Sequence, residues 1–215
     1  MHLDRNFSEA YMLDALSHFM EKEGYELLEA KKQFRKEDET GFQNVILSVS
    51  PYDDLVMIEF HFGIRIHAVE DMVGSFTRSL KGWRPDAHTI IISQGKLLDK
   101  AYWRFEAKSI RDLDEIVLAF QQMWSGKISL FLNQYFRLEG IHELLNLDPK
   151  SPSKYLPNQG HRYLRGLVVA RLLQKENFEE LVKIYSHQMA ELPQGEILKP
   201  GMEKLVKYLR NISLN

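Results

Sequence analysis

One stretch of thirteen residues, LVMIEFHFGIRIH at positions 55–67, restricts the fold more than any other part of the sequence. All of its even positions are apolar, and from Glu59 onward its odd positions are polar or glycine. Because successive side chains of a β-strand point to opposite faces, this pattern predicts a strand with one apolar and one polar face. The alternation never changes phase, which argues against a β-bulge before Ile66. We therefore expect this strand to form the centre of a sheet, with helices covering its apolar face.

The other segments with helical or strand periodicity are separated by residues that are typical of turns. Helical spacing begins at Ser8, which is assigned as an N-cap, and ends at Gly24, which has the position of a C′ glycine. Further strands are predicted at 25–34, 41–51, 88–93 and 100–108. Further helices are predicted at 109–136, with Ser109 as N-cap, and at 137–147, 161–177, 178–192 and 195–211.

The order of these segments predicts an α+β fold. About five strands follow one another with short connections, which favours an antiparallel meander because parallel pairing needs a crossover of a dozen or more residues. The sheet domain is expected to span 1–147, with helices packed on one face. A linker is expected at 148–160, where DPKSPSKYLPNQG contains three prolines. Residues 161–215 are expected to form a helical hairpin and a terminal helix, which could pack back on the first domain.

Composition excludes several classes of function. The 215 residues carry a net charge of −2, so no overall field favours nucleic acid or an anionic membrane. The absence of cysteine excludes disulfides, thiolate catalysis and cysteine-ligated zinc. The first twenty residues lack the unbroken apolar core of a signal peptide, and no window approaches the roughly 20 apolar residues of a membrane span. A cytoplasmic protein without membrane or nucleic-acid partners is expected.

The polar face of the 55–67 strand supplies the candidate site. Glu59 and His61 lie about 6.6 Å apart along the strand and could share a metal ion, whereas His67 lies roughly 20 Å from His61, too far for the same ion. A third ligand would have to come from another segment, and His88 is the candidate. The alternative is a solvated sheet face whose charges pair with those of neighbouring strands.

Gly63 interrupts that polar face between His61 and Arg65. Either an aromatic side chain such as Tyr102 covers the exposed backbone, or a ligand or partner approaches it there. The candidate binding residues are Glu59, His61, Gly63, Arg65, His67, Tyr102 and Arg104. No catalytic residue, metal or cofactor is assigned, because the sequence contains no nucleophile elbow, phosphate-binding glycine loop or H-E-x-x-H motif.

Basic residues of the C-terminal region form two weaker groups. Arg162, Arg165 and Arg171 lie on the first of its predicted helices. On the last, Lys204, Lys207 and Arg210 follow steps of three residues opposite apolar positions, which is typical of a solvated helix face.

Three segments resemble the opening of an uncharacterised bacterial domain family of unknown function. They are EKEGYELLEAKKQFRKE, GFQNVILSVSPYDD and VMIEFHFGIRI, and the matching positions are Gly24, Tyr25, Phe34, Gly63 and Ile64. The resemblance covers about residues 7–145 and implies a domain of one sheet with helices. It brings no catalytic residues, and the very long third strand departs from the pattern.

The sequence leaves two alternative functions, which belong to different classes. The first is a cytoplasmic interaction module, of an immunity or regulatory type, that binds another protein through its sheet face or its helical tail. The second is a small-ligand binder or metal-assisted enzyme that uses Glu59, His61 and Arg65 around Gly63. The sequence does not fix the oligomeric state.

Overall fold

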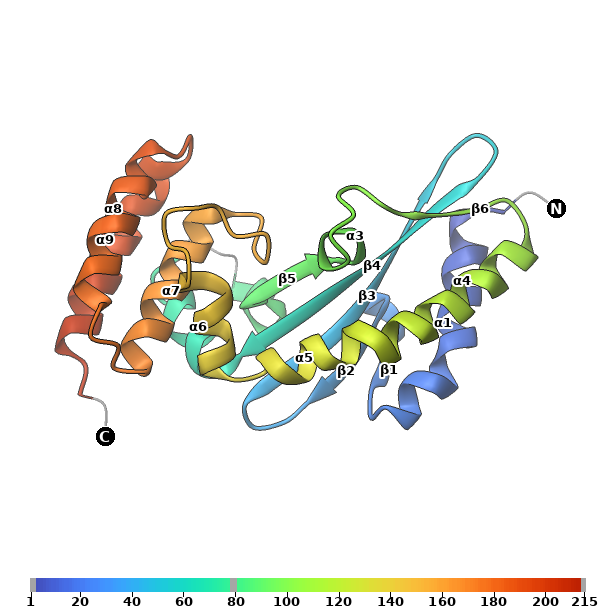
Figure 1. Cartoon of the computed structure of the whole chain (residues 1–215), viewed down its shortest axis with the longest axis horizontal. Helices are drawn as coiled ribbons and strands as arrows, with labels where there is room; N and C mark the ends of the chain where they lie inside the picture. The colour runs from blue at the N-terminus through green and yellow to red at the C-terminus, as the bar shows by residue number, and fades with distance from the viewer. Residues whose placement is uncertain (1–2, 78–80, 214–215) are drawn as a thin grey trace. The chain divides into compact units, whose positions relative to one another are not determined.

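The computed structural model describes residues 3–77 and 81–213. They form an α+β fold with an antiparallel sheet in meander order and C-terminal helices, which confirms the predicted fold class (Figure 1). Two compact units make up the chain. The first contains the residues up to Asp38, Phe42–Ile64 and Ile91–Gln134; the second contains Glu39–Gly41, Arg65–Ile90 and the residues from Tyr135 onward.

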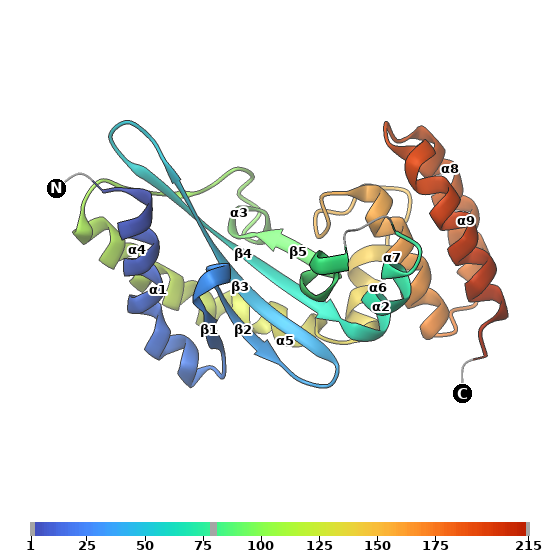
Figure 2. The same ribbon diagram turned by 180° about the vertical axis from the view of Figure 1, so that it is seen from behind.

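The sheet has the order β1-β2-β3-β4-β5, and β6 pairs with β4 beside that path. Its strands are β1 (Glu26–Leu28), β2 (Gln33–Glu37), β3 (Gly41–Pro51), β4 (Val56–Ile66), β5 (Ile90–Ser93) and β6 (Phe105–Ala107). The predicted strand at 25–34 is therefore two strands, with Leu27 opposite Phe34. A 3-10 turn (Glu29–Lys31) and the left-handed Lys32 reverse the chain between them. Figure 2 shows β3 and β4 as the two long strands.

The prediction that the even residues of the 55–67 stretch form the buried face of a strand is confirmed. The six even residues of β4, from Val56 to Ile66, are at most 2% exposed. Helix α4 (Ile110–Met123) covers this face, and the rings of Phe60 and Phe120 lie 4.5 Å apart. The strand ends at Ile66, and His67 is the first residue of helix α2 (His67–Gly74).

The other helices of the first unit follow local signals. Helix α1 (Arg5–Lys22) begins three residues before the predicted N-cap, because Asp4 rather than Ser8 accepts the hydrogen bond from a first-turn amide. Gly24 ends the helix with φ +84°, as predicted. A capping box of Ser109 and Asp112 begins α4. The predicted 109–136 helix continues through a π-helical segment (Trp124–Ile128) into α5 (Ser129–Tyr135), and the short α3 is Gln94–Leu97.

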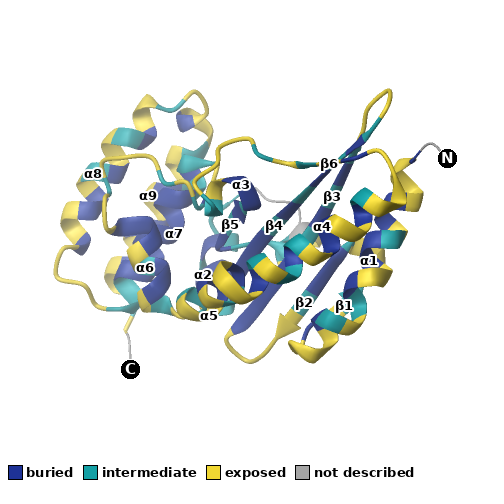
Figure 3. Cartoon of the chain, turned by 45° about the vertical axis from the view of Figure 1, so that its right-hand side comes forward, coloured by how far each residue is buried: buried dark blue, intermediate teal, exposed yellow. Residues whose placement is uncertain are grey.

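The second unit is built around α7 (Gln159–Leu172), which contacts four other helices. They are α2, α6 (Leu138–Asn146), α8 (Phe178–Glu191) and α9 (Gly195–Asn211). Ten of the fourteen residues of α7 are buried, and Figure 3 shows that burial along the helix. A helix buried on nearly every side lies at the centre of its unit.

The division into units differs from the predicted boundary at 148–160. Helix α6 precedes that segment and α7 follows it, yet both belong to the second unit and pack on each other. Arg162 ties the segment down, because its buried guanidinium donates to the carbonyls of Leu145, Asp148 and Ser151. The three prolines therefore lie in an ordered connection within one unit.

Candidate functional site

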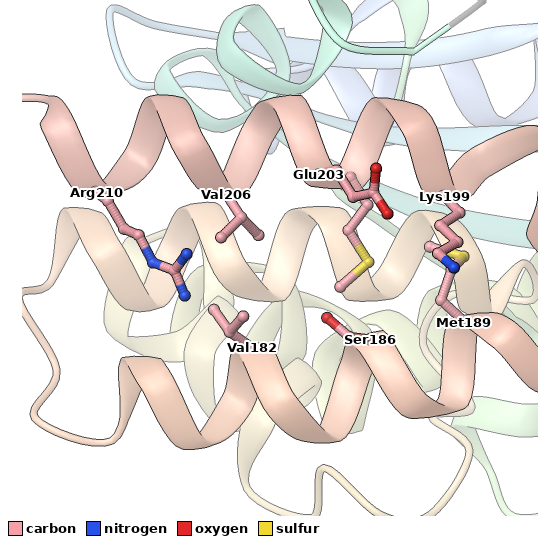
Figure 4. Close-up of a pocket in the computed structure, with 8 residues that line it drawn as sticks. Val182, Ser186, Met189, Lys199, Glu203, Val206 and Arg210 are labelled. Carbon is pink, nitrogen blue, oxygen red and sulfur yellow. The ribbon is translucent and has the colours of Figure 1, made fainter.

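A groove of about 370 Å³ lies between α8 and α9 in the second unit (Figure 4). Its floor is apolar and contains Val182, Met189, Met202 and Val206, all of them buried. Its rim is polar and contains the exposed residues Ser186, Lys199, Glu203 and Arg210. An apolar floor with a few polar groups around it is the usual composition of a binding pocket.

Helical spacing in both helices produces this groove. Met202 and Val206 are four residues apart on α9, and Val182 and Met189 are seven apart on α8, so each pair lies on one helix face. The turn between the helices requires Gly195, because a Cβ there would overlap the carbonyl oxygen of Met189. Glycine thus allows α9 to begin against the end of α8.

An ion pair closes one end of the groove. Arg210 donates through Nε and Nη2 to the two carboxylate oxygens of Glu179, at 3.0 and 2.7 Å. These hydrogen bonds lower the pKa of the Glu179 carboxyl, which is therefore ionised at neutral pH. Both side chains remain about half exposed, so the pair joins the two helices at a solvated edge.

A second hollow of about 410 Å³ adjoins the groove, since Arg210 lines both. Arg171, Lys175 and Glu179 also line this hollow, where α7 ends and α8 begins. Arg171 donates to the carbonyl oxygens of Leu209 and Ile212 at the end of α9. The hollow therefore contains three cationic side chains and one carboxylate.

The structure brings together three of the residues predicted for the sheet face. In the first unit, the Arg104 Nε lies 3.2 Å from the Glu59 Oε2, and the His61 Nε2 lies 3.5 Å from the same oxygen. Burial lowers the pKa of His61; the Glu59 carboxylate opposes this shift and the Arg104 guanidinium adds to it. The imidazole is therefore mainly neutral at pH 7, and the cluster can offer both a carboxylate and a guanidinium to a ligand.

The other predicted residues lie elsewhere. Arg65 is buried in the second unit, where it donates to Asp71, to the ring of His67 and to the carbonyls of Arg84 and Ala87. These hydrogen bonds use the donors of the Arg65 guanidinium, so Arg65 has a structural role and connects the surrounding segments of the chain. His67 begins α2 and does not continue the strand face.

Gly63 is buried, and Tyr102 is 95% exposed, so Tyr102 is not the aromatic cover that was one of the two alternatives for Gly63. Only Phe105–Ala107 of the predicted 100–108 strand is extended. Asp99 and Tyr102 have positive φ, and this left-handed backbone interrupts the pleat before Trp103.

The two histidines considered as metal ligands belong to different units, His61 to the first and His88 to the second. Within residues 3–77 and 81–213, no group of three or more histidine, aspartate or glutamate side chains could hold a metal ion. In the same ranges, no helix has the length and apolar character needed to cross a membrane.

Comparison with known proteins adds no relative: no protein-family model, curated protein or solved structure matches the chain. The resemblance of residues 7–145 to an uncharacterised bacterial family therefore stays a prediction.

Sequence reasoning did not find the α8–α9 groove. Its floor residues have ordinary core spacing, and the same apolar pattern would result if a further helix covered them. Of its rim residues, only Arg210 belongs to the basic helix face that the sequence indicates. The signal that could have indicated a groove is the pair of methionines on facing helices, because methionine is common at adaptable binding surfaces.

Proposed function

We propose that this chain is a protein-interaction module that binds a partner segment in the groove between α8 and α9. The observation that carries the proposal is the buried apolar floor of that groove, with Met189 and Met202, inside a rim of charged side chains. An amphipathic helix that lies in such a groove buries its apolar face and leaves its polar face in water. The partner is a regulatory or immunity-type protein. The proposal includes the cytoplasmic location that the sequence predicts.

The test uses one exposed residue on the rim. Ser186→Arg places a long side chain in the groove without disturbing its floor, whereas His187→Arg adds the same side chain at an exposed neighbouring position that does not line it. Quantitative affinity purification from isotope-labelled cells should recover a stoichiometric partner with the wild-type chain and with His187→Arg. Ser186→Arg should lose it. Equal recovery by both variants would contradict binding in this groove.

A second proposal is a small-ligand site at Glu59, His61 and Arg104. It is favoured by the convergence of these three side chains in the first unit, at 3.2 and 3.5 Å. A thermal-shift series with phosphate, citrate and divalent metal ions tests it, because a ligand at 100 times its Kd stabilises a protein by about 2.7 kcal/mol. Arg104→Gln should abolish a shift produced by an anion. An anion-induced shift that survives in this variant would exclude Arg104 from the site.

A further inference from the structure

The charge around the second hollow indicates what kind of partner segment the groove receives. Arg171, Lys175 and Arg210 contribute three positive charges there, and Glu179 contributes one negative charge. The hollow adjoins the groove at Arg210, which lines both, so the Arg210–Glu179 pair lies at the boundary between them. A segment that fills the groove would therefore extend into positive potential at its Arg210 end.

Two of these cations can receive a carboxylate without disturbing the fold. The Lys175 side chain makes no hydrogen bond or ion pair among the described residues, and it is exposed. The Arg210–Glu179 pair is 51% and 56% exposed, and exposed pairs contribute little to stability. An incoming carboxylate can thus share the Arg210 guanidinium or replace Glu179 there at small cost.

The length of the groove sets the size of the segment. Lys199 and Arg210 mark its ends on α9, and 1.5 Å per residue places them about 16 Å apart along the helix axis. Three helical turns span this distance. The other end carries both Lys199 and Glu203, so it has no comparable excess of charge.

From these observations we infer that the partner segment is an amphipathic helix of about three turns with aspartate or glutamate side chains at its Arg210 end. This inference rests on the proposed function and adds the charge of the partner. The acidic side chains contact Arg210 and Lys175, while apolar side chains spaced by three, four and seven residues lie on the floor.

A display library of random peptides about 16 residues long, enough for roughly four helical turns, provides the probe. Selection is carried out on the wild-type full chain, and peptides that also bind Ser186→Arg are removed. The remaining groove-dependent peptides should combine the apolar spacing with aspartate or glutamate at one end. They are then synthesised with blocked termini, so that side chains alone supply the carboxylates.

Binding of these peptides is measured on two charge-reversal variants. Lys175→Glu should weaken binding about three- to tenfold, and the loss should shrink as salt is added. Lys204→Glu is the matched control, since Lys204 is an exposed α9 residue that lines neither hollow. Circular dichroism checks that both variants are folded.

The outcomes separate the two proposals. Groove-dependent peptides without acidic enrichment, or with equal affinity for the Lys175→Glu and wild-type chains, would overturn the carboxylate inference and leave the proposed function standing. A selection that yields no peptide sensitive to Ser186→Arg would overturn both.

Discussion

The ion pair between Glu70 of α2 and Arg165 of α7 should respond very differently to single and double mutation. Arg165 donates through Nε and Nη2 to the two Glu70 oxygens at 2.8 and 2.6 Å, and the side chains are 7% and 3% exposed. Removing one partner leaves the other charge buried, which typically costs about 3–5 kcal/mol. We therefore expect Glu70→Leu and Arg165→Met each to lower the free energy of unfolding by that amount.

The double variant should lose only about 0–2 kcal/mol, because it removes both charges and leaves apolar side chains of similar volume. Urea unfolding followed by far-UV circular dichroism measures these values. The two compact units require a separate fit if two transitions appear. Arg111→Met is the control, since its pair with Glu115 is exposed and should contribute less than about 0.5 kcal/mol. If Arg165→Met costs no more than Arg111→Met, the argument from burial is wrong.

Three further predictions concern packing and protonation. Gly166→Ala should destabilise the protein by about 1–3 kcal/mol, because the new Cβ would overlap the buried side-chain amide of Asn146. Gly126→Ala is the control: its Cβ meets no atom within 4 Å, so thermal unfolding should show an unchanged or raised stability. Burial raises the pKa of Tyr185 to about 12. The protonated phenol should therefore contribute fully to the free energy of unfolding below pH 10, and this contribution should disappear as pH rises to about 12. Tyr185→Phe should flatten this part of a stability–pH curve. Titration of His61 by NMR should give a pKa below 6.5, and Glu59→Gln should lower it further, while a rise in that variant would contradict the assigned interaction.

Much of the fold could be predicted because its signals are local. The alternation in β4 depends on neighbouring residues alone, and the Ser109 capping box and the Gly24 helix end each involve only a few residues. Predictions failed where two local signals competed. Asp4 and Ser8 are both good N-caps; Asp4 caps the helix, and the Ser8 hydroxyl donates to the Asp4 carbonyl oxygen from inside the first turns.

The candidate site was predicted only in part. Glu59 and His61 share a strand face by periodicity, so their proximity followed from the sequence. Arg104 was expected on a strand and instead reaches Glu59 from the turn segment before β6. Arg65 has the same periodicity as these residues, but burial gives it a structural role that the pattern did not reveal.

The sequence by itself determined the period of each element and hence the α+β class. Tertiary structure alone decided which charges are buried and where a hollow remains. Arg165 is separated from Glu70 by 95 residues, and nothing near either residue identifies the other. The α8–α9 groove likewise exists because two helices meet along one line and no described helix covers that line. Periodicity follows from short-range backbone geometry, whereas burial and cavities depend on which distant surfaces come together.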